Sequence, residues 1–179
     1  ERGIYPSHFG FSLYITDHKG RLVRTSFRIH EFNTVEDHSF FIAQRDDCCL
    51  GMVISSEQKN QPPDRKMVQF SRRINHPDGK FAGVLVISVG SEFLTAFQNE
   101  ALPGSYDFVS ARLAGDSVLS TRAGSGNVKH DTVYRRDPGF NQLRGAIYES
   151  GEHFDDERAR YVAWRMLDDY PLVAVAGLT

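Results

Sequence analysis

The sequence predicts an α+β fold made of two modules in tandem, residues 1–98 and 99–179. Two observations support this prediction. Short β-prone runs alternate with turns rich in Gly and Asp, and the order of hairpin, crossover and three antiparallel strands occurs twice. The 179 residues, of which 40% are hydrophobic and 25% charged, suit two small domains of ordinary soluble composition. Each module is expected to be a mostly antiparallel sheet flanked by helices.

The first module is predicted to contain a hairpin, a helix, three strands and a closing helix. The elements in order are strands 9–16 and 21–26, a helix over 35–45 with Thr34 or Asp37 as its cap, strand 50–55, a polar loop over 57–65, strands 66–74 and 80–89, and a helix over 91–99. The bend Asn75–Gly79 is the clearest signal, because Pro77-Asp78-Gly79 supplies a fixed φ and then a positive φ. Residues 80–89 are almost continuously apolar, which indicates a central buried strand.

The second module repeats this order from about residue 106. Its predicted elements are strands 106–113 and 117–121, a mobile Gly/Ser-rich loop over 123–130, a short helix over 138–144, and strands 145–150, 158–167 and 172–178. The turn at Gly115-Asp116 matches the Asp/Gly turn Asp17–Gly20 of the first module. The similarity between the modules lies in the order of their elements and not in residue identity.

Charge and hydropathy exclude several classes of protein. A formal net charge of −2 argues against a nucleic-acid-binding protein, which is usually clearly basic. The longest apolar runs, 81–89 and 171–178, are about half the roughly 20 residues that a membrane-spanning helix needs. No signal-peptide pattern is present at the start. We therefore expect a piece of a longer protein whose membrane anchors lie outside this sequence.

The two cysteines, Cys48 and Cys49, are adjacent. A disulfide between neighbours is strained, because the usual Cα separation of a disulfide exceeds one peptide step. One interpretation is a redox or metal switch. The other, which general cysteine behaviour favours, is a pair of small side chains at the end of a helix or in a loop.

Catalytic motifs are absent from the sequence. No two histidines stand four residues apart on a predicted helix beside a carboxylate, as a zinc site of that type requires. The glycines of Gly124–Asn127 lack the lysine of a phosphate-binding loop, and no nucleophile elbow is present. We expect no enzymatic activity, no cofactor and no metal in this chain.

Several stretches together resemble one family. These are Phe70-Ser71-Arg72-Arg73-Ile74-Asn75, then Pro77-Asp78-Gly79-Lys80-Phe81-Ala82-Gly83-Val84-Leu85-Val86, then Ser91-Glu92-Phe93-Leu94, the ending Tyr161–Arg165 with Asp169–Leu178, and Asp17 with Gly20 in the opening hairpin. They resemble the double-Cache, or PAS-like, sensor domains of bacterial signalling proteins. The resemblance covers most of the chain. The long N-terminal helix that packs along both modules in that family is missing here.

The resemblance implies a role in signalling. Such domains lie outside the cytoplasmic membrane, are anchored by transmembrane helices, and control a diguanylate cyclase, phosphodiesterase, histidine kinase or chemoreceptor module. It implies a sensor that works as a homodimer and responds to a small-molecule ligand by a shift between two populations. The alternative is a ligand-free dimerisation or partner-binding module of the same kind of receptor.

The resemblance also places a candidate ligand site in the first module. Where relatives that bind amino acids carry an Arg-plus-aromatic motif, this chain reads Asp37-His38-Ser39-Phe40-Phe41, and Ser88 stands where they carry an Asp. An amino acid needs a fixed cation and a fixed anion, so we expect a ligand of another kind. The predicted pocket residues are His38, Phe41, Gln69, Ser71, Arg73 and Ser88.

The two neighbouring arginines leave two alternatives open. Gln69, Ser71 and Arg73 share one face of their strand, and Arg72 lies on the other face, so one arginine must point to the helix layer. Arg73 either anchors an anionic ligand, or both arginines pair with helix carboxylates such as Glu36 or Asp37. The second alternative is favoured, because buried arginines are usually paired.

Overall fold

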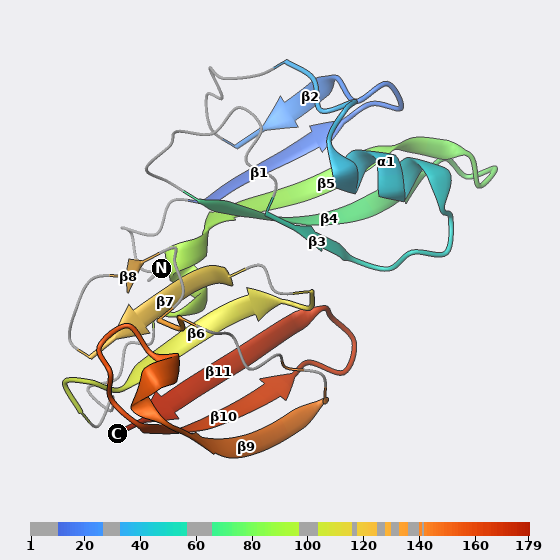
Figure 1. Ribbon diagram of the computed structural model, residues 1–179. Coiled ribbons are helices and arrows are strands. Elements are labelled where there is room, and N and C mark those ends of the chain that lie inside the picture. The colour runs from blue at the N-terminus through green and yellow to red at the C-terminus, as the bar shows by residue number, and fades with distance from the viewer. Residues whose placement is uncertain are drawn as a thin grey trace, which may run out of the picture. The chain divides into compact units, whose positions relative to one another are not determined.

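The computed structural model describes residues 11–26, 33–56, 66–96, 104–115, 118–124, 128–129, 133–135, 140 and 142–179. The predicted loop over 57–65 lies outside these residues, as do residues 138, 139 and 141 of the predicted helix over 138–144. The chain divides into two compact units, Glu1–Gly90 and Ser91–Thr179, each with its own antiparallel sheet (Figure 1). The division falls before the predicted boundary at residue 98, so the turn that follows Gly90 belongs to the second unit.

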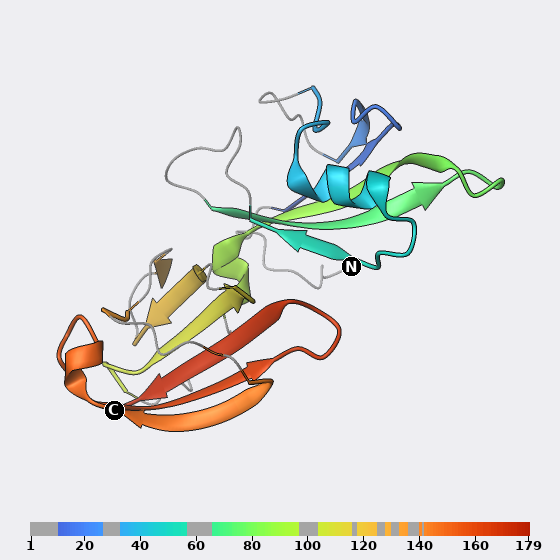
Figure 2. The same ribbon diagram turned by 45° about the vertical axis from the view of Figure 1, so that its right-hand side comes forward.

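The first unit contains a five-stranded antiparallel sheet in the order β2-β1-β5-β4-β3. Its strands are β1 (Phe11–Thr16), β2 (Leu22–Thr25), β3 (Val53–Ser55), β4 (Met67–Asn75) and β5 (Phe81–Gly90). The helix α1 (Ser39–Asp46) lies over one face of this sheet, as Figure 2 shows. The core between helix and sheet consists of buried side chains from Tyr14, Val35, Phe40, Phe41, Val84 and Val86.

Both predicted hairpins of the first unit are confirmed. In the first, the Asp17 carboxylate accepts hydrogen bonds from the backbone N–H groups of Lys19 (2.8 Å) and Arg21 (2.9 Å), which holds the turn closed. In the second, Gly79 adopts a φ of 83°, which the Pro-Asp-Gly sequence predicted and which a residue with a Cβ rarely adopts. β4 and β5 pair over their whole lengths.

The helix begins later than the sequence predicted. Its N-cap is His38, without a side-chain hydrogen bond, so the predicted caps Thr34 and Asp37 are wrong. The physical reason is a contact distant in sequence: the Val35 N–H donates to the carbonyl of Gly20 (2.9 Å), and Thr34 pairs with Arg21. Backbone that pairs with the first hairpin is not available to start a helix.

The second unit contains a six-stranded antiparallel sheet in the order β8-β7-β6-β11-β10-β9. Its elements are β6 (Phe108–Leu113), β7 (Val118–Ala123), β8 (Val128–Lys129), β9 (Arg144–Glu149), β10 (Arg160–Met166) and β11 (Leu172–Leu178), with 3-10 turns η1 (Ser91–Leu94) and η2 (Gly151–His153). With β8 set aside, both sheets have the same order of strands relative to the chain. Aromatic rings of Phe108, Tyr134 and Phe154 meet Val162, Val173 and Val175 in its core.

Three expectations for this unit need correction. The helix predicted over 91–99 is a single 3-10 turn that ends at Leu94, and residues 97–99 lie outside the described part of the chain. The loop predicted over 123–130 contains β8, which pairs with β7 through Val128 and Lys129. Arg144, placed in a helix, begins β9. The described residues are thus mostly sheet, with α1 as their one α-helix, and none of their helices is long and apolar enough to span a membrane.

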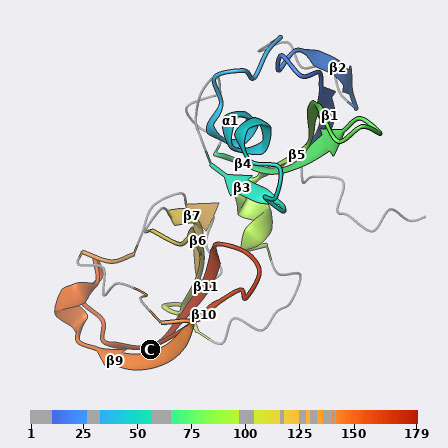
Figure 3. The same cartoon turned by 90° about the vertical axis from the view of Figure 1, so that its right-hand side faces the viewer.

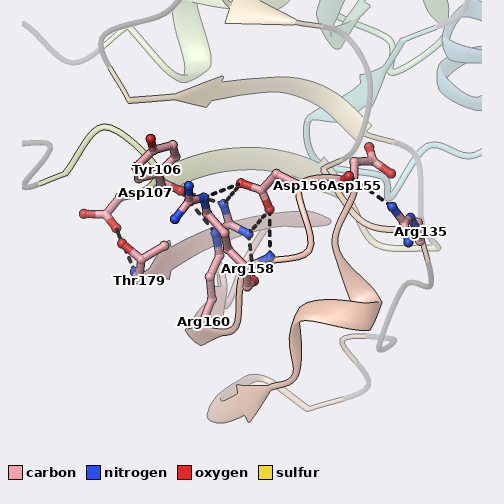
Figure 4. A network of polar contacts seen from close by, with 8 residues as sticks. All are labelled: Tyr106, Asp107, Arg135, Asp155, Asp156, Arg158, Arg160 and Thr179. Carbon is pink, nitrogen blue, oxygen red and sulfur yellow. Dashed lines mark hydrogen bonds and ion pairs between the residues drawn. The ribbon is translucent and has the colours of Figure 1, made fainter.

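A polar network holds the start of β10 in the second unit (Figure 4). Arg160, only 4% exposed, donates from Nη1 and Nη2 to the two carboxylate oxygens of Asp156 (2.8 and 2.6 Å) and from Nη2 to the carbonyl of Tyr106 (2.8 Å). Its guanidinium also lies 4.6 Å from the ring centroid of Phe154. A buried arginine is tolerated here because a carboxylate, a carbonyl and a ring surround it.

Candidate ligand-binding site

A row of polar side chains crosses four strands of the first sheet. Ser12 of β1 lies opposite Ser88 of β5, Ser88 lies opposite Gln69 of β4, and Gln69 lies opposite Ser55 of β3. Directly opposite residues of antiparallel strands point to the same face. The four side chains, here called the polar row, therefore stand side by side on one face of the sheet.

The polar row lies on the face of the sheet that carries α1. Val84 and Val86, which precede Ser88 at alternate positions of β5, pack against Phe40 and Phe41 of the helix. Because alternate residues of a strand share a face, Ser88 points to the same side. Figure 3, which views α1 nearly along its axis, shows the helix over this side of β4.

The two central residues of the polar row, Gln69 and Ser88, are buried, and each has a polar group that forms no hydrogen bond with the described residues. Gln69 is 5% exposed and Ser88 is 7% exposed. The Ser55 hydroxyl donates to the Gln69 amide oxygen at 3.4 Å. Among the described residues, the Gln69 amide nitrogen and the Ser88 hydroxyl form no hydrogen bond. A polar ligand could therefore accept a hydrogen bond from the Gln69 amide and exchange one with the Ser88 hydroxyl.

The next row along the sheet belongs to the scaffold. The Ser71 hydroxyl, which is fully buried, donates to the carbonyl of Val53 at 3.2 Å. The Gln44 amide nitrogen of α1 donates to the carbonyl oxygens of Ser71 (3.1 Å) and Gly51 (2.8 Å), and thereby holds the helix to β4. Phe41 lies in the apolar core. Two of the six predicted pocket residues, Phe41 and Ser71, therefore have internal partners.

Arg73 secures the C-terminal end of α1. Its Nη1 donates to the carbonyl oxygens of Gln44 and Arg45, its Nε donates to Asn75 (2.7 Å), and its guanidinium lies 4.7 Å from the ring centroid of Phe81. The last carbonyls of a helix have no partner within the helix and carry partial negative charge, which suits a guanidinium. The prediction that Arg73 pairs with helix carboxylates is wrong, since its partners are carbonyl oxygens. Arg72 is exposed on the other face of β4.

His38 lies at the opposite end of the helix from Arg73. It is 5% exposed, its ring lies 5.3 Å from that of Phe40, and its carbonyl accepts the N–H groups of Phe41 and Ile42. An eight-residue helix is about 12 Å long, so His38 and Arg73 cannot hold the same atom of a small ligand. Of the six predicted residues, Gln69 and Ser88 are the pair that lies directly opposite on neighbouring strands. The sequence-based prediction did not include Ser12 and Ser55. Both lie in strands, β1 and β3, in which more buried and less buried residues follow one another.

Electrostatics on this face are neutral near the polar row. The four side chains of the polar row are uncharged: three carry a hydroxyl group and one carries an amide. Burial raises the pKa of the Tyr14 hydroxyl far above its ordinary value, so Tyr14, next to Ser12 on the same face of β1, is uncharged at neutral pH. Among the described residues, the polar row offers neutral hydrogen bonds and no fixed ion pair.

The second unit has a different kind of concavity. A hollow of about 450 Å³ lies on the face of its sheet opposite the core, and small and aliphatic side chains dominate its lining. In β11, Ala174 and Ala176 line the hollow, and Val173 and Val175, which also belong to the core, border it. The lining includes Thr95, Ser110 and Arg165 but is mainly apolar, so the hollow offers few of the polar groups that typically orient a small polar ligand.

Comparisons with solved structures support one class of fold. The extracellular domain assigned to a histidine kinase, rpHK1S-Z16, has a TM-score of 0.71 at 22% identity, over 93% of this chain and 69% of that chain. The ligand-binding domain of the Pseudomonas aeruginosa amino acid chemoreceptor PctB, in complex with L-Arg, has a TM-score of 0.64 at 11% identity, over 99% and 74%. That of PctC from the same organism, in complex with GABA, has a TM-score of 0.61 at 13% identity, over 94% and 74%.

The chain thus has the fold of the extracellular sensor domains of histidine kinases and chemoreceptors. This is the Cache-type fold that the sequence resemblance implied. No family model and no curated protein matches the sequence.

Proposed function

We propose that this chain is the extracytoplasmic sensing region of a membrane-bound signalling protein and that its first unit recognises a small polar ligand. The observation that supports this proposal is the polar row, in which Gln69 and Ser88 are almost fully buried with unused hydrogen-bonding groups. In the next row, Val86 and Val53 pack against the core, and the hydroxyl of Ser71 between them is bonded to the Val53 carbonyl. The polar row has no such internal bonds for the Ser88 hydroxyl and the Gln69 amide nitrogen among the described residues. Polar groups that converge on a buried face are what ligand sites add to an apolar surface.

The chemistry of the polar row favours a neutral ligand over an amino acid. A zwitterion is held by a fixed cation on its carboxylate and a fixed anion on its ammonium. Near the row neither is present among the described residues, because the nearest predicted cation, Arg73, is used by the helix carbonyls. The complexes of PctB and PctC contain L-Arg and GABA, and in our proposal this chain differs from those relatives in its ligand.

Ligand binding would act on the rest of the protein through a population shift. We propose that the two units are PAS-like modules in tandem. The long N-terminal helix of the family would then lie outside this sequence. A ligand on β4 and β5 meets strands that Gln44 and Arg73 tie to α1, so it can favour one arrangement of helix and sheet over another. The sensing region would control a cytoplasmic diguanylate cyclase, phosphodiesterase or histidine kinase module, and the whole protein would work as a homodimer. The chain itself would have no catalytic activity.

A thermal-stability screen tests the ligand proposal. We expect neutral compounds such as polyols, amides and purines to stabilise the chain, and carboxylates and amines to leave its stability unchanged. A ligand at a hundred times its dissociation constant adds about 2.7 kcal/mol to the stability of the unit that binds it. Ser88→Ala should weaken the affinity of a hit up to about tenfold, the effect of losing one hydrogen bond. Ser110→Ala is the matched control, because Ser110 is a buried strand serine of the second unit.

A second candidate function, dimerisation without a ligand, is favoured by the apolar hollow of the second unit. Analytical ultracentrifugation separates the two functions. A chain that dimerises in isolation and is stabilised by no compound of any class would support the second function and contradict the first. A chain that a neutral compound stabilises, with the effect reduced in Ser88→Ala, supports the sensor.

A further inference from the structure

The two cysteines lie together in the connection between α1 and β3. The Sγ atoms of Cys48 and Cys49 are 3.3 Å apart, and both side chains are exposed. One ligand atom from each of Asp47, Cys48 and Cys49 lies within 4.8 Å of the other two. Two sulfur atoms and a carboxylate thus converge at one point of the surface.

The backbone around this cluster is fixed on both sides. The Cys49 N–H donates to the Asp47 carboxylate (2.8 Å), which closes a tight local turn and leaves the second carboxylate oxygen available. Upstream, Arg73 holds the end of α1, and downstream the Gly51 carbonyl accepts from Gln44. A short connection held at both ends keeps the two thiols near each other and so lowers the entropic cost of using both for one ligand.

A disulfide between the two cysteines is disfavoured by geometry. Consecutive Cα atoms across a trans peptide are about 3.80 Å apart, whereas disulfides usually join Cα atoms roughly 4.4–6.8 Å apart. The structure has no cis peptide bond among the described residues, so Cys48 and Cys49 keep the trans separation. The pair is therefore expected to stay reduced, and each sulfur can then bind a metal as a thiolate.

We propose that the thiolates of Cys48 and Cys49, with the Asp47 carboxylate beside them as a neighbouring negative charge, form a binding site for a soft, thiolate-preferring cation of low coordination number, with monovalent copper as the chemical type. Thiolates select soft cations, whereas carboxylates and carbonyls suit magnesium and calcium. A closed tetrahedral zinc site needs four protein ligands, and three consecutive residues supply only three. The carbonyls at the end of α1 cannot complete the set, because Arg73 occupies those of Gln44 and Arg45.

Binding at this site releases protons. The cation binds the two sulfurs as thiolates, so each Cys loses its S–H proton to solvent as its metal–sulfur bond forms. The cation therefore competes with protons for the two sulfurs, and its affinity increases as the pH rises.

Titration with Ag⁺, a redox-inert counterpart of monovalent copper, tests the site on the whole chain. These are the only two cysteines, so every thiolate-to-metal charge-transfer signal in the ultraviolet reports this site. We expect one Ag⁺ per chain by native mass spectrometry, with affinity that rises with pH. Cys48→Ser and Cys49→Ser should each lower affinity by more than the roughly 10–100-fold that loss of an outer-shell partner costs. Mg²⁺ should not compete.

Asp46→Asn is the matched control for Asp47→Asn. Both carboxylates are exposed at the end of α1, but that of Asp46 pairs with Arg45 and lies outside the cluster. Asp47→Asn should weaken Ag⁺ binding and Asp46→Asn should not. The site is contradicted if either cysteine variant binds Ag⁺ as tightly as the parent chain, if one Ag⁺ bridges two chains, or if the air-purified chain has no reactive thiol. None of these outcomes depends on whether the polar row binds a ligand.

Discussion

Gln69 on β4 and Ser88 on β5 lie directly opposite each other, and both side chains point to the face of the sheet that carries α1. Ser88 interrupts the most apolar strand of the sequence, in which the two preceding residues on the same face, Val86 and Val84, are part of the core. Polar groups at such a position weaken packing unless they bond something. The pair is therefore the feature of this chain that most directly indicates a binding role.

Arg73 should stabilise the first unit, whereas its neighbour Arg72 should not. We expect Arg73→Met to lower the free energy of unfolding of that unit by about 1.5–3 kcal/mol, the range for hydrogen bonds to a charged group. Arg72→Met, at an exposed position, should change it by less than about 0.5 kcal/mol. Hydrogen exchange of the β4 amides measures both. Equal effects of the two substitutions would contradict the assigned role of Arg73.

Asp156 should make the second unit sensitive to acid. Its hydrogen bonds to Arg160 hold the pKa of the Asp156 carboxyl below its usual range. A carboxyl with a lowered folded pKa contributes stability above its unfolded pKa, near about 3.9, and this contribution is lost as the pH falls through the folded pKa. Asp156→Asn should therefore destabilise the unit at pH 7 and differ progressively less from the parent below about pH 4.

The fluorescence of Trp164, the only tryptophan, measures this effect, because that residue lies in β10 of the same unit. Asp155→Asn is the matched control, since the Asp155 carboxylate has no side-chain hydrogen bond or ion pair among the described residues. When unfolding by urea is followed through this fluorescence, the midpoint of Asp155→Asn should equal that of the parent chain at every pH. An Asp156→Asn midpoint that also follows the parent would contradict the Arg160 pairing.

Asp107 should hold the end of β11. Its buried carboxylate accepts the backbone N–H (2.8 Å) and the hydroxyl (3.1 Å) of Thr179, as Figure 4 shows. Asp107→Ala removes both bonds and should abolish the exchange protection of the Thr179 amide, at a cost of about 1 kcal/mol. Thr179→Val removes only the hydroxyl and should retain that protection. If the Thr179→Val substitution were enough to abolish the protection, the hydrogen bond from the backbone N–H of residue 179 to Asp107 would be contradicted.

Local sequence signals predicted most of the sheet. The Pro77-Asp78-Gly79 bend and the apolar run after it gave β4, β5 and their pairing, because turn chemistry and alternation act between neighbours in the chain. β11 was predicted with the bounds Leu172–Leu178 that the structure has. The start of α1 and the strand β8 were missed, because both depend on backbone pairing with segments that no local pattern identifies.

The candidate site was predictable only in part, for the same reason. Alternation within β4 placed Gln69, Ser71 and Arg73 on one face. Ser12 and Ser55 join Gln69 and Ser88 only once the register of β1 against β5 and of β3 against β4 is known. The carbonyl partners of Arg73 depend on how the last turn of α1 lies against β4, which no local pattern shows, although the end of the helix was predicted to within one residue.

The most direct test of the ligand proposal is an NMR titration of the isotope-labelled chain with the most stabilising neutral compound. We expect the largest shift changes at the amides of Ser12, Gln69 and Ser88 and at the Gln69 side-chain amide, with weaker changes in Ser88→Ala. Shift changes confined to the second unit, or unchanged affinity in both Ser88→Ala and Gln69→Leu, would contradict a ligand site at the polar row.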